Sequence, residues 1–377
     1  MALSTEREKA MSSEAAAGRR QMPRAVLWLA AAVIVLVPLR AAAERRDDRF
    51  LVGAIYGLTG ILADFSGEFK NGARMFLDFQ EASGKAEIAI EFEDSRWDPK
   101  TAVSAYRKLV SLNGVKAVHV MGSGTSLAIK PLAEQDGIIL FTAGAHRDLL
   151  SGARLVIRHA NLADRDAKVL AESVARHVPA PRRIAELYIE NEWGEEYHRH
   201  LGRFLRELLP SAELLAEPHL PDEADFRPQL LRLTRAAPQA FVVNSAGAPA
   251  ALIIKELVRT DFTGAIFVNN GLALSASAER LLREAGIKGF YQQVYPAVDP
   301  RFRAEYTARY HKEPGYFAMA AHLDCELLQR AAAEAGRDPR KMAAFIRRLG
   351  VFKGRFETVR ISPDGDIPIE TSVKAFE

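Results

Sequence analysis

The chain has 377 residues, of which 48% are hydrophobic and 26% charged, and its formal net charge is +3. This composition is that of an ordinary globular α/β protein, and it excludes a collagen-like, disulfide-rich or disordered chain. Because a single core rarely grows beyond about 250–300 residues, the length predicts two lobes of roughly 150 residues each.

The first 43 residues differ from the rest. Arginines precede an apolar run of 13 residues from Ala25 to Val37, and small residues follow up to Ala43. This order is typical of a secretory signal peptide, which we expect to be cleaved after Ala43. An uncleaved anchor is the alternative, but the run is shorter than the about 20 residues that span a bilayer. Because no cysteine lies near the cleavage point to receive a lipid, we expect a free periplasmic protein, translated from Met1 or from Met22.

The net charge comes from this leader. Residues 1–43 hold six basic and three acidic residues, so residues 44–377 hold 45 of each. Such a balance gives no argument for nucleic acid as a partner. Cys325 is the single cysteine, which excludes an internal disulfide and a cysteine-based metal site.

From Phe50 onward, short apolar runs alternate with longer segments of helical period, such as Lys100 to Leu112. This alternation predicts an α/β fold with mostly parallel sheets and helices on both faces. The predicted strands are residues 50–56, 87–93, 115–121, 137–142, 183–189, 239–243, 265–268 and 289–294.

Aspartate followed by proline marks three expected helix starts, at Asp98, Asp299 and Asp338. An aspartate side chain caps free N–H groups, and proline at the first helical position lacks the N–H that would need a partner. These acids are therefore predicted to be structural.

The order of the elements also predicts where the chain passes between the lobes. The alternation starts anew after residues 158–161, and a return is expected near residues 295–300. At the end of the chain, the turn Ser362-Pro-Asp-Gly365 predicts a hairpin between residues 352–361 and 367–376. The first lobe is therefore assigned to residues 44–160 and 297–350, and the second to residues 161–296 and 351–377.

Three loops rich in small and polar residues follow predicted strands of the first lobe. They are Gly57–Gly60 with Phe65 nearby, Met121–Ser126, and Phe141–His146, which contains Gly144. The second loop opens a predicted helix, whose free N–H groups favour a carboxylate or phosphate. A plain tight turn with a capping hydroxyl is the structural alternative. Since parallel strands end at one edge of a sheet, we expect these loops to line one pocket.

The sequence lacks the common catalytic motifs. Neither Gly-x-Ser-x-Gly nor His-Glu-x-x-His occurs, and no loop ends in Gly-Lys-Ser/Thr. The histidines His119, His146 and His159 lie on separate predicted elements without the spacing of metal ligands. We therefore expect neither an enzyme nor a metal or cofactor site, and retain His146 as a candidate hydrogen-bond donor in the pocket.

Five segments of the chain carry a family pattern. They are VGAIYGLTGILADFSGEFKNGARMFLDF from Val52, EDSRWDPKTAVSAYRKLV from Glu93, GSGTSLAIKPLAEQDGIILFTAGA from Gly122, YIENEWGEEY from Tyr188 and EPGYFAMAA from Glu313. In this order they resemble the Leu/Ile/Val-binding branch of the type I periplasmic binding proteins, which serve ABC importers. The resemblance implies two lobes, joined by three crossovers, that close around a ligand by hinge bending.

The resemblance also implies roles for single residues. Ser123 stands where the family binds an α-carboxylate, Phe65 and Trp193 where aromatic side chains cover the ligand, and Phe317 where an apolar wall lies. These four positions are compatible with a small ligand that has a carboxylate and an apolar body.

Two positions depart from the family pattern. A carboxylate-binding threonine is replaced by His146, and the acidic residue that receives the ligand's ammonium is replaced by Asn270. Because a buried ammonium needs a counter-charge, an α-amino acid is disfavoured. Trp97 and Gly122 stand where some members carry a disulfide.

We therefore expect the monomeric substrate-binding component of an ABC importer, with membrane permease subunits as partners. The expected ligand is an aromatic or branched aliphatic acid without an α-ammonium, held at its polar end by Ser123 and His146. A branched-chain amino acid is an alternative ligand, as is an amide or urea-like molecule bound by Asn270. An exported sensor or regulatory subunit with the same fold is the rival from another class.

Overall fold

The computed structural model of the protein describes residues 49–84, 87–260, 262–272, 287 and 289–376. The predicted leader, residues 1–43, and its cleavage point lie outside this part of the chain. Of the helices in the described part, none is long and apolar enough to cross a membrane.

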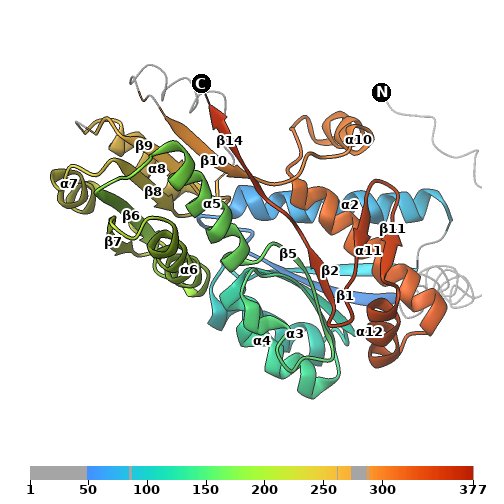
Figure 1. The fold of residues 1–377 in the computed structure, drawn as a ribbon. Coiled ribbons are helices and arrows are strands. Elements are labelled where there is room, and N and C mark those ends of the chain that lie inside the picture. The colour runs from blue at the N-terminus through green and yellow to red at the C-terminus, as the bar shows by residue number, and fades with distance from the viewer. Residues whose placement is uncertain (1–48, 85–86, 261, 273–286, 288, 377) are drawn as a thin grey trace, which may run out of the picture. The chain divides into compact units, whose positions relative to one another are not determined.

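Strands and helices alternate as predicted, and twelve of the described strands form two six-stranded sheets (Figure 1). The first sheet has the order β2-β1-β3-β4-β5-β13, and all its neighbouring strands are parallel. Helices α2, α11 and α12 pack on one face of it, and α3 and α4 on the other. These elements are β1 (Phe50–Tyr56), α2 (Ala63–Ala82), β2 (Ile88–Asp94), α3 (Pro99–Ser111), β3 (Ala117–Met121), α4 (Ser123–Asp136), β4 (Ile139–Ala143), β5 (Val156–Ala160), α11 (Tyr316–Ala335), α12 (Pro339–Arg348) and β13 (Asp366–Pro368).

The second sheet has the order β7-β6-β8-β9-β10-β14, in which β14 alone runs antiparallel to its neighbour. Helices α5 and α6 cover one face, and α7 and α8 cover the other. The elements are α5 (Ala163–His177), β6 (Arg183–Ile189), α6 (Glu192–Leu208), β7 (Glu213–His219), α7 (Arg227–Arg235), β8 (Ala240–Asn244), α8 (Gly247–Leu257), β9 (Ala265–Val268), β10 (Phe290–Val294) and β14 (Ser372–Phe376). A short helix η1 (Arg147–Leu149) and helix α10 (Pro300–Tyr310) complete the described helices.

All eight predicted strands are present, with ends that differ by two residues at most. Two strands were not predicted. In β5, Arg158 and His159 interrupt the apolar run, yet both are buried, because the Arg158 guanidinium bonds Asp366 and the His159 imidazole bonds Asp324. Strand β7 contains Pro218 and lies at the edge of its sheet, where a missing N–H is tolerated.

The three predicted aspartate caps are confirmed. Asp98 accepts a hydrogen bond from the N–H of Thr101, and Asp299 and Asp338 each accept bonds from N–H groups in the first turns of α10 and α12. Proline occupies the first turn in each case, so the sequence pattern and the structure agree on where these helices begin.

The predicted hairpin at the end of the chain is wrong. The turn at residues 362–365 exists, but β13 joins the first sheet beside β5, while β14 joins the second sheet beside β10. A shorter hairpin precedes them, formed by β11 (Val351–Lys353) and β12 (Thr358–Arg360). The assignment of all of residues 351–377 to the second lobe is therefore wrong as well.

The physical reason is that β13 completes the first lobe. Asp366 pairs with the buried Arg158, and Ile367 fills the core of the first lobe. The chain passes to the second sheet only at residues 369–371, as the red C-terminal segment shows (Figure 1). This is the third connection between the sheets, after those that follow β5 and β10.

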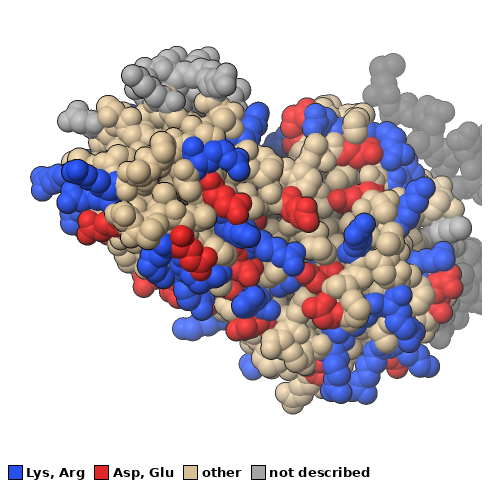
Figure 2. Space-filling view, in the orientation of Figure 1, with Lys and Arg blue, Asp and Glu red and all other residues tan. Residues whose placement is uncertain are grey.

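Basic and acidic side chains are interspersed on the face of the molecule shown in Figure 2. This distribution agrees with the equal numbers of basic and acidic residues among residues 44–377.

Helices α2 and α11 pack so closely at Gly72 that no space is left there for a side chain. A Cβ added at Gly72 of α2 would lie 1.9 Å from the carbonyl oxygen of Ala318 on α11. We expect Gly72→Ala to lower the free energy of unfolding by about 1–3 kcal/mol, because α11 must move away. Urea unfolding measures this change.

Gly67 on the same helix is the matched control, since a Cβ there meets nothing within 4 Å. Gly67→Ala should leave stability unchanged or raise it by up to about 1 kcal/mol, because alanine favours the helix. Equal effects of the two substitutions would contradict the close contact.

Candidate ligand-binding site

One pocket lies where the carboxyl edges of the two sheets meet. Ligands of open parallel sheets bind at this edge, where the strand order reverses, which here is beside β1 and beside β6. The pocket encloses about 530 Å³ of empty space, part of it open to solvent. Its lining residues are Leu62, Phe65, Trp97, Met121, Gly122, Ser123, Ala143, Ala145, Asn161, Trp193, Ala246, Asn270, Gly271, Tyr295 and Phe317.

Most of the predicted site residues meet in this pocket, although they come from both lobes and are separated by up to 252 positions in the chain. Gly144 and His146 are the two that do not line it. Those that line it are Phe65, Ser123, Trp193, Asn270 and Phe317.

Ser123 lies at the first turn of α4 and is buried. Its hydroxyl oxygen accepts the N–H of Ala145 at 3.1 Å, which leaves the hydroxyl proton free to donate. No side chain caps α4, because Thr125 bonds the carbonyl oxygens of Met121 and Gly122 instead. Ser123 lines the pocket at the uncapped N-terminus of α4, so a hydroxyl donor and the positive end of a helix dipole lie together at this end of it.

The expectation that His146 donates into the pocket is wrong. Its Nε2 lies 2.9 Å from Oε2 of Glu196, a residue of α6 in the second lobe, and its Nδ1 accepts the N–H of Asp148. The Glu196 side chain is 2% exposed, and a buried carboxylate needs a partner. The imidazole is therefore engaged across the lobes.

The expectation that Gly144 lines the pocket is also wrong. Its N–H donates to the Thr142 hydroxyl at 3.0 Å, and a Cβ there would lie 2.6 Å from the side chain of Leu149. Gly144 is needed for tight packing behind the pocket, and its neighbours Ala143 and Ala145 provide the lining.

Aromatic rings form most of the apolar wall. The ring of Phe317 lies 5.2 Å from that of Phe65 and 4.7 Å from that of Tyr295, both in edge-to-face geometry. Trp193 enters from the second lobe, on a helix whose first N–H groups are capped by Asn191. Tyr295 was not predicted, because it follows a strand in the second lobe and carries no motif.

Trp97 is a second lining residue that the sequence did not reveal as such. Arg96 and Trp97 both have positive φ angles, of 52° and 59°, which are unfavourable for side chains of this size. Hydrogen bonds from their N–H groups to the side chains of Asp94 and Ser95 hold this turn. The indole lies against Gly122, where a Cβ would come within 2.4 Å of its Nε1.

The polar end of the pocket in the second lobe rests on a buried carboxylate. Asp166 of α5 accepts hydrogen bonds from the amides of Asn161 and Asn270, the latter at 2.8 Å, and from the hydroxyl of Thr371 at 2.5 Å. Burial raises the pKa of Asp166 from 3.8 to about 6, although these hydrogen bonds act in the opposite direction.

The other predicted histidines serve the core of the first lobe. His119 and His159 bond the two oxygens of Asp324, at 2.9 and 2.8 Å, and Tyr56 contacts the far side of His119. Within the described residues, no group of three or more His, Cys, Asp and Glu side chains is arranged to hold a metal ion.

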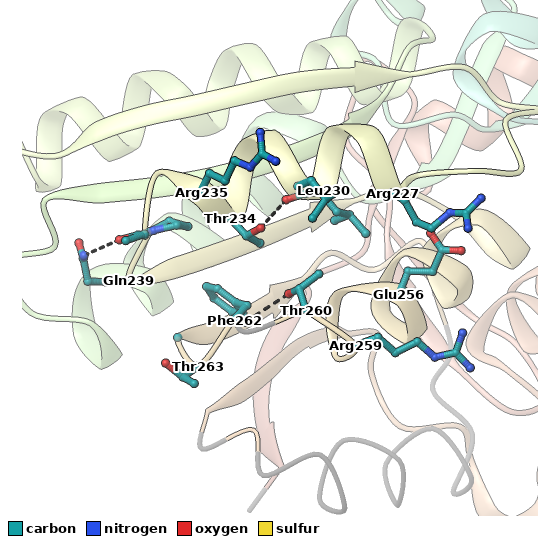
Figure 3. Close-up of a pocket in the computed structure, with 14 residues that line it drawn as sticks. Arg227, Leu230, Thr234, Arg235, Gln239, Glu256, Arg259, Thr260, Phe262 and Thr263 are labelled. Atoms are coloured by element: carbon teal, nitrogen blue, oxygen red, sulfur yellow. Dashed lines mark hydrogen bonds between the residues drawn. The ribbon is translucent and has the colours of Figure 1, made fainter.

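A wider hollow lies elsewhere on the second lobe, between α7 and α8 (Figure 3). It is lined by Arg227, Arg235, Arg259 and Glu256, and it borders the amino ends of β8 and β9. This is the opposite edge of the sheet from the predicted site residues.

These features define a class of protein, in which two α/β lobes enclose a small solute at their facing sheet edges. The chain belongs to the periplasmic binding protein family, whose model matches residues 51–371. The resemblance of the five sequence segments to the type I, Leu/Ile/Val-binding branch is thereby confirmed.

Individual relatives agree with this placement. The chain is 26% identical over 166 residues to the Leu/Ile/Val-binding protein BraC3 of Rhizobium johnstonii, a match that covers 42% of the chain and 45% of BraC3. It thus spans less than half the length of this curated relative.

Two solved structures show the same fold. The leucine-binding protein LivK of Thermotoga maritima has a TM-score of 0.75 at 21% identity, over 86% of this chain and 94% of LivK. A solute-binding protein of an ABC transporter from R. palustris, in complex with benzoate, has a TM-score of 0.76 at 16% identity, over 87% and 93%.

The raised pKa of Asp166 predicts a specific pH dependence. The folded protein holds this proton more tightly than the unfolded chain, so the ionised group costs stability above pH 6, and this cost shrinks as the pH falls toward 4. Between pH 8 and pH 5 the wild type should gain about 1 kcal/mol relative to Asp166→Asn, which cannot titrate. Urea unfolding of both proteins at the two pH values measures the difference. Parallel pH profiles would show that Asp166 has an ordinary pKa.

Proposed function

We propose that the protein is the substrate-binding component of an ABC importer, and that it encloses a small aromatic carboxylate without an α-ammonium. The observation that carries this proposal is the lining of the pocket. It joins free helix N–H groups and a hydroxyl donor at one end to aromatic walls, and none of the described lining residues is charged.

The carboxylate binds at the first turn of α4 in this proposal. The N–H groups of that turn carry the positive end of the helix dipole, and the Ser123 hydroxyl adds a donor. The aromatic body of the ligand then contacts Phe65, Phe317 and Tyr295 from one side and Trp193 from the other.

An α-amino acid fits this lining poorly. Its ammonium would be buried without a carboxylate in contact, because Asp166 lies behind Asn270 and already accepts three hydrogen bonds. Burial of an unpaired charge is costly, so the site favours an acid that carries no ammonium. A urea-like ligand is disfavoured as well, because it needs both donor and acceptor from Asn270, whose NH₂ group already donates to Asp166.

The named relatives divide between an aromatic carboxylate and branched-chain amino acids. The R. palustris protein holds benzoate, whereas BraC3 and LivK are named for branched-chain amino acids. A branched-chain amino acid is therefore the alternative ligand.

Export, partner and motion complete the proposal. The leader directs the chain to the periplasm, where a monomer delivers its ligand to permease subunits in the inner membrane. The three connections between the sheets act as the hinge, and closure brings the two halves of the pocket together.

The ligand preference is tested by thermal shift and titration calorimetry with matched pairs of molecules. Benzoate and phenylacetate should raise the melting temperature, while phenylalanine and leucine at equal concentration should not, because only the amino acids carry an ammonium. Stabilisation by leucine alone would favour the alternative ligand.

Substitution of Ser123 tests the carboxylate end. Ser123→Ala should weaken benzoate binding by about tenfold or more, since hydrogen bonds to a charged group are strong. Ser126→Ala is the control, because its buried hydroxyl lies on the same helix but bonds Thr142 away from the pocket.

The partner is tested by co-purification from membranes solubilised in mild detergent. We expect the protein to recover the membrane subunits of an ABC transporter, and to do so more strongly when its ligand is bound. Recovery of a membrane sensor in their place would support the rival function.

A further inference from the structure

We infer that Asp166 is a specificity-determining positioning residue, which turns the amide of Asn270 so that the site selects ligands bearing an N–H or O–H donor away from the carboxylate. This inference rests on the proposed function and names the ligand more closely.

The carboxylate of Asp166 is the point on which two pocket amides converge. Nδ2 of Asn270 and Nδ2 of Asn161 both donate to its Oδ2, and the Thr371 hydroxyl donates to its Oδ1. The residue is 1% exposed and does not line the pocket. An ionised carboxylate can only accept hydrogen bonds, so it holds the NH₂ group of each amide toward itself.

The two amide oxygens then differ in one respect. Oδ1 of Asn161 lies 3.3 Å from the hydroxyl of Tyr295, which donates to it. Oδ1 of Asn270 is buried and has no hydrogen-bond partner among the described residues. Since Asn270 lines the pocket, the group that it offers to a ligand is an acceptor.

A buried acceptor without a partner costs free energy, and a ligand that supplies a donor removes this cost. A ligand with a methyl group or an acceptor at this position leaves the oxygen unpaired and is rejected. The preferred ligand therefore carries a carboxylate for Ser123 in the first lobe and a donor for Asn270 in the second, so that it joins the two lobes.

The position of Asp166 supports a role beyond folding. It follows the first connection between the sheets and bonds Thr371 in the third, so it is fixed to the hinge while it holds the pocket amide. Burial of this carboxylate raises its pKa, which means that its charge is retained at the expense of stability.

The experiment compares benzoates that differ in one substituent at the 3- or 4-position, measured by calorimetry on the purified protein. The substituents are amino, a donor; methyl, which forms no hydrogen bond; and formyl, which only accepts. At either the 3- or the 4-position, the amino compound should bind at least about tenfold more tightly than the methyl and the formyl compounds substituted at that same position.

Asp166→Ala should reduce the ratio of amino to formyl affinity below about threefold, because the freed amide of Asn270 rotates and offers its NH₂ group. Thr371→Val is the matched control, since it removes another hydrogen bond to the same carboxylate but leaves the amide held, and it should keep the wild-type ratio. Should Asp166→Ala fail to fold, Asn270→Leu provides the second variant, and it should abolish the preference for amino over methyl.

An unchanged ratio in Asp166→Ala or in Asn270→Leu overturns the inference, as does a wild type that prefers the formyl compound or shows no preference. Unsubstituted benzoate separates this failure from that of the proposed function. If benzoate binds and the amino compound has no advantage, the inference alone falls. If no benzoate binds, the proposed ligand class falls and the inference falls with it.

Discussion

Every group in the pocket depends on one property of a parallel sheet, which is that all its strands end at the same edge. In this chain both sheets turn that edge toward a single cavity. Phe65 of α2 and Phe317 of α11 lie 5.2 Å apart beside this cavity, although 252 residues separate them in the chain, because the two helices pack together. Loops at these edges carry the binding groups, while the strands behind them keep the loops in place. The pocket is therefore a product of topology as much as of its own side chains.

Desolvation decides how such a pocket selects its ligand. The lining offers a hydroxyl donor at the start of α4 in the first lobe and, among the described side chains, an unpaired acceptor at Asn270 in the second, with aromatic rings beside them. Where water is excluded, each unpaired polar group penalises a ligand that fails to match it. At this end the buried carboxylate of Asp166 lies behind the lining and accepts a hydrogen bond from the amide of Asn270.

The features that could be predicted from the sequence are those that depend on local pattern. Strand β1 was located by its apolar run, the start of α3 by Asp98 and Pro99, and the pocket-lining loop at Ser123 by small residues between a strand and a helix. The family resemblance, and no local pattern, identified four more lining residues of the pocket, which are Phe65, Trp193, Asn270 and Phe317.

What could not be predicted depends on distant partners or on backbone strain. His146 turns from the pocket because Glu196 is buried 50 positions further on, and β13 joins the first sheet because Arg158 requires Asp366. Trp97 reaches the pocket through two residues with positive φ, a conformation that its sequence does not announce. No sequence motif marks Asp166, because its surroundings form only in the fold, where two amides and one hydroxyl donate hydrogen bonds to its carboxylate.

Two tryptophans of the described residues, Trp97 and Trp193, lie on opposite lobes and both line the pocket. Indole emission depends on the polarity and the quenching groups around the ring, so the proposed closure and ligand binding would change the emission of both residues. Trp97 and Trp193 are therefore intrinsic fluorescent probes, one on each side of the pocket, and no dye or added residue is needed.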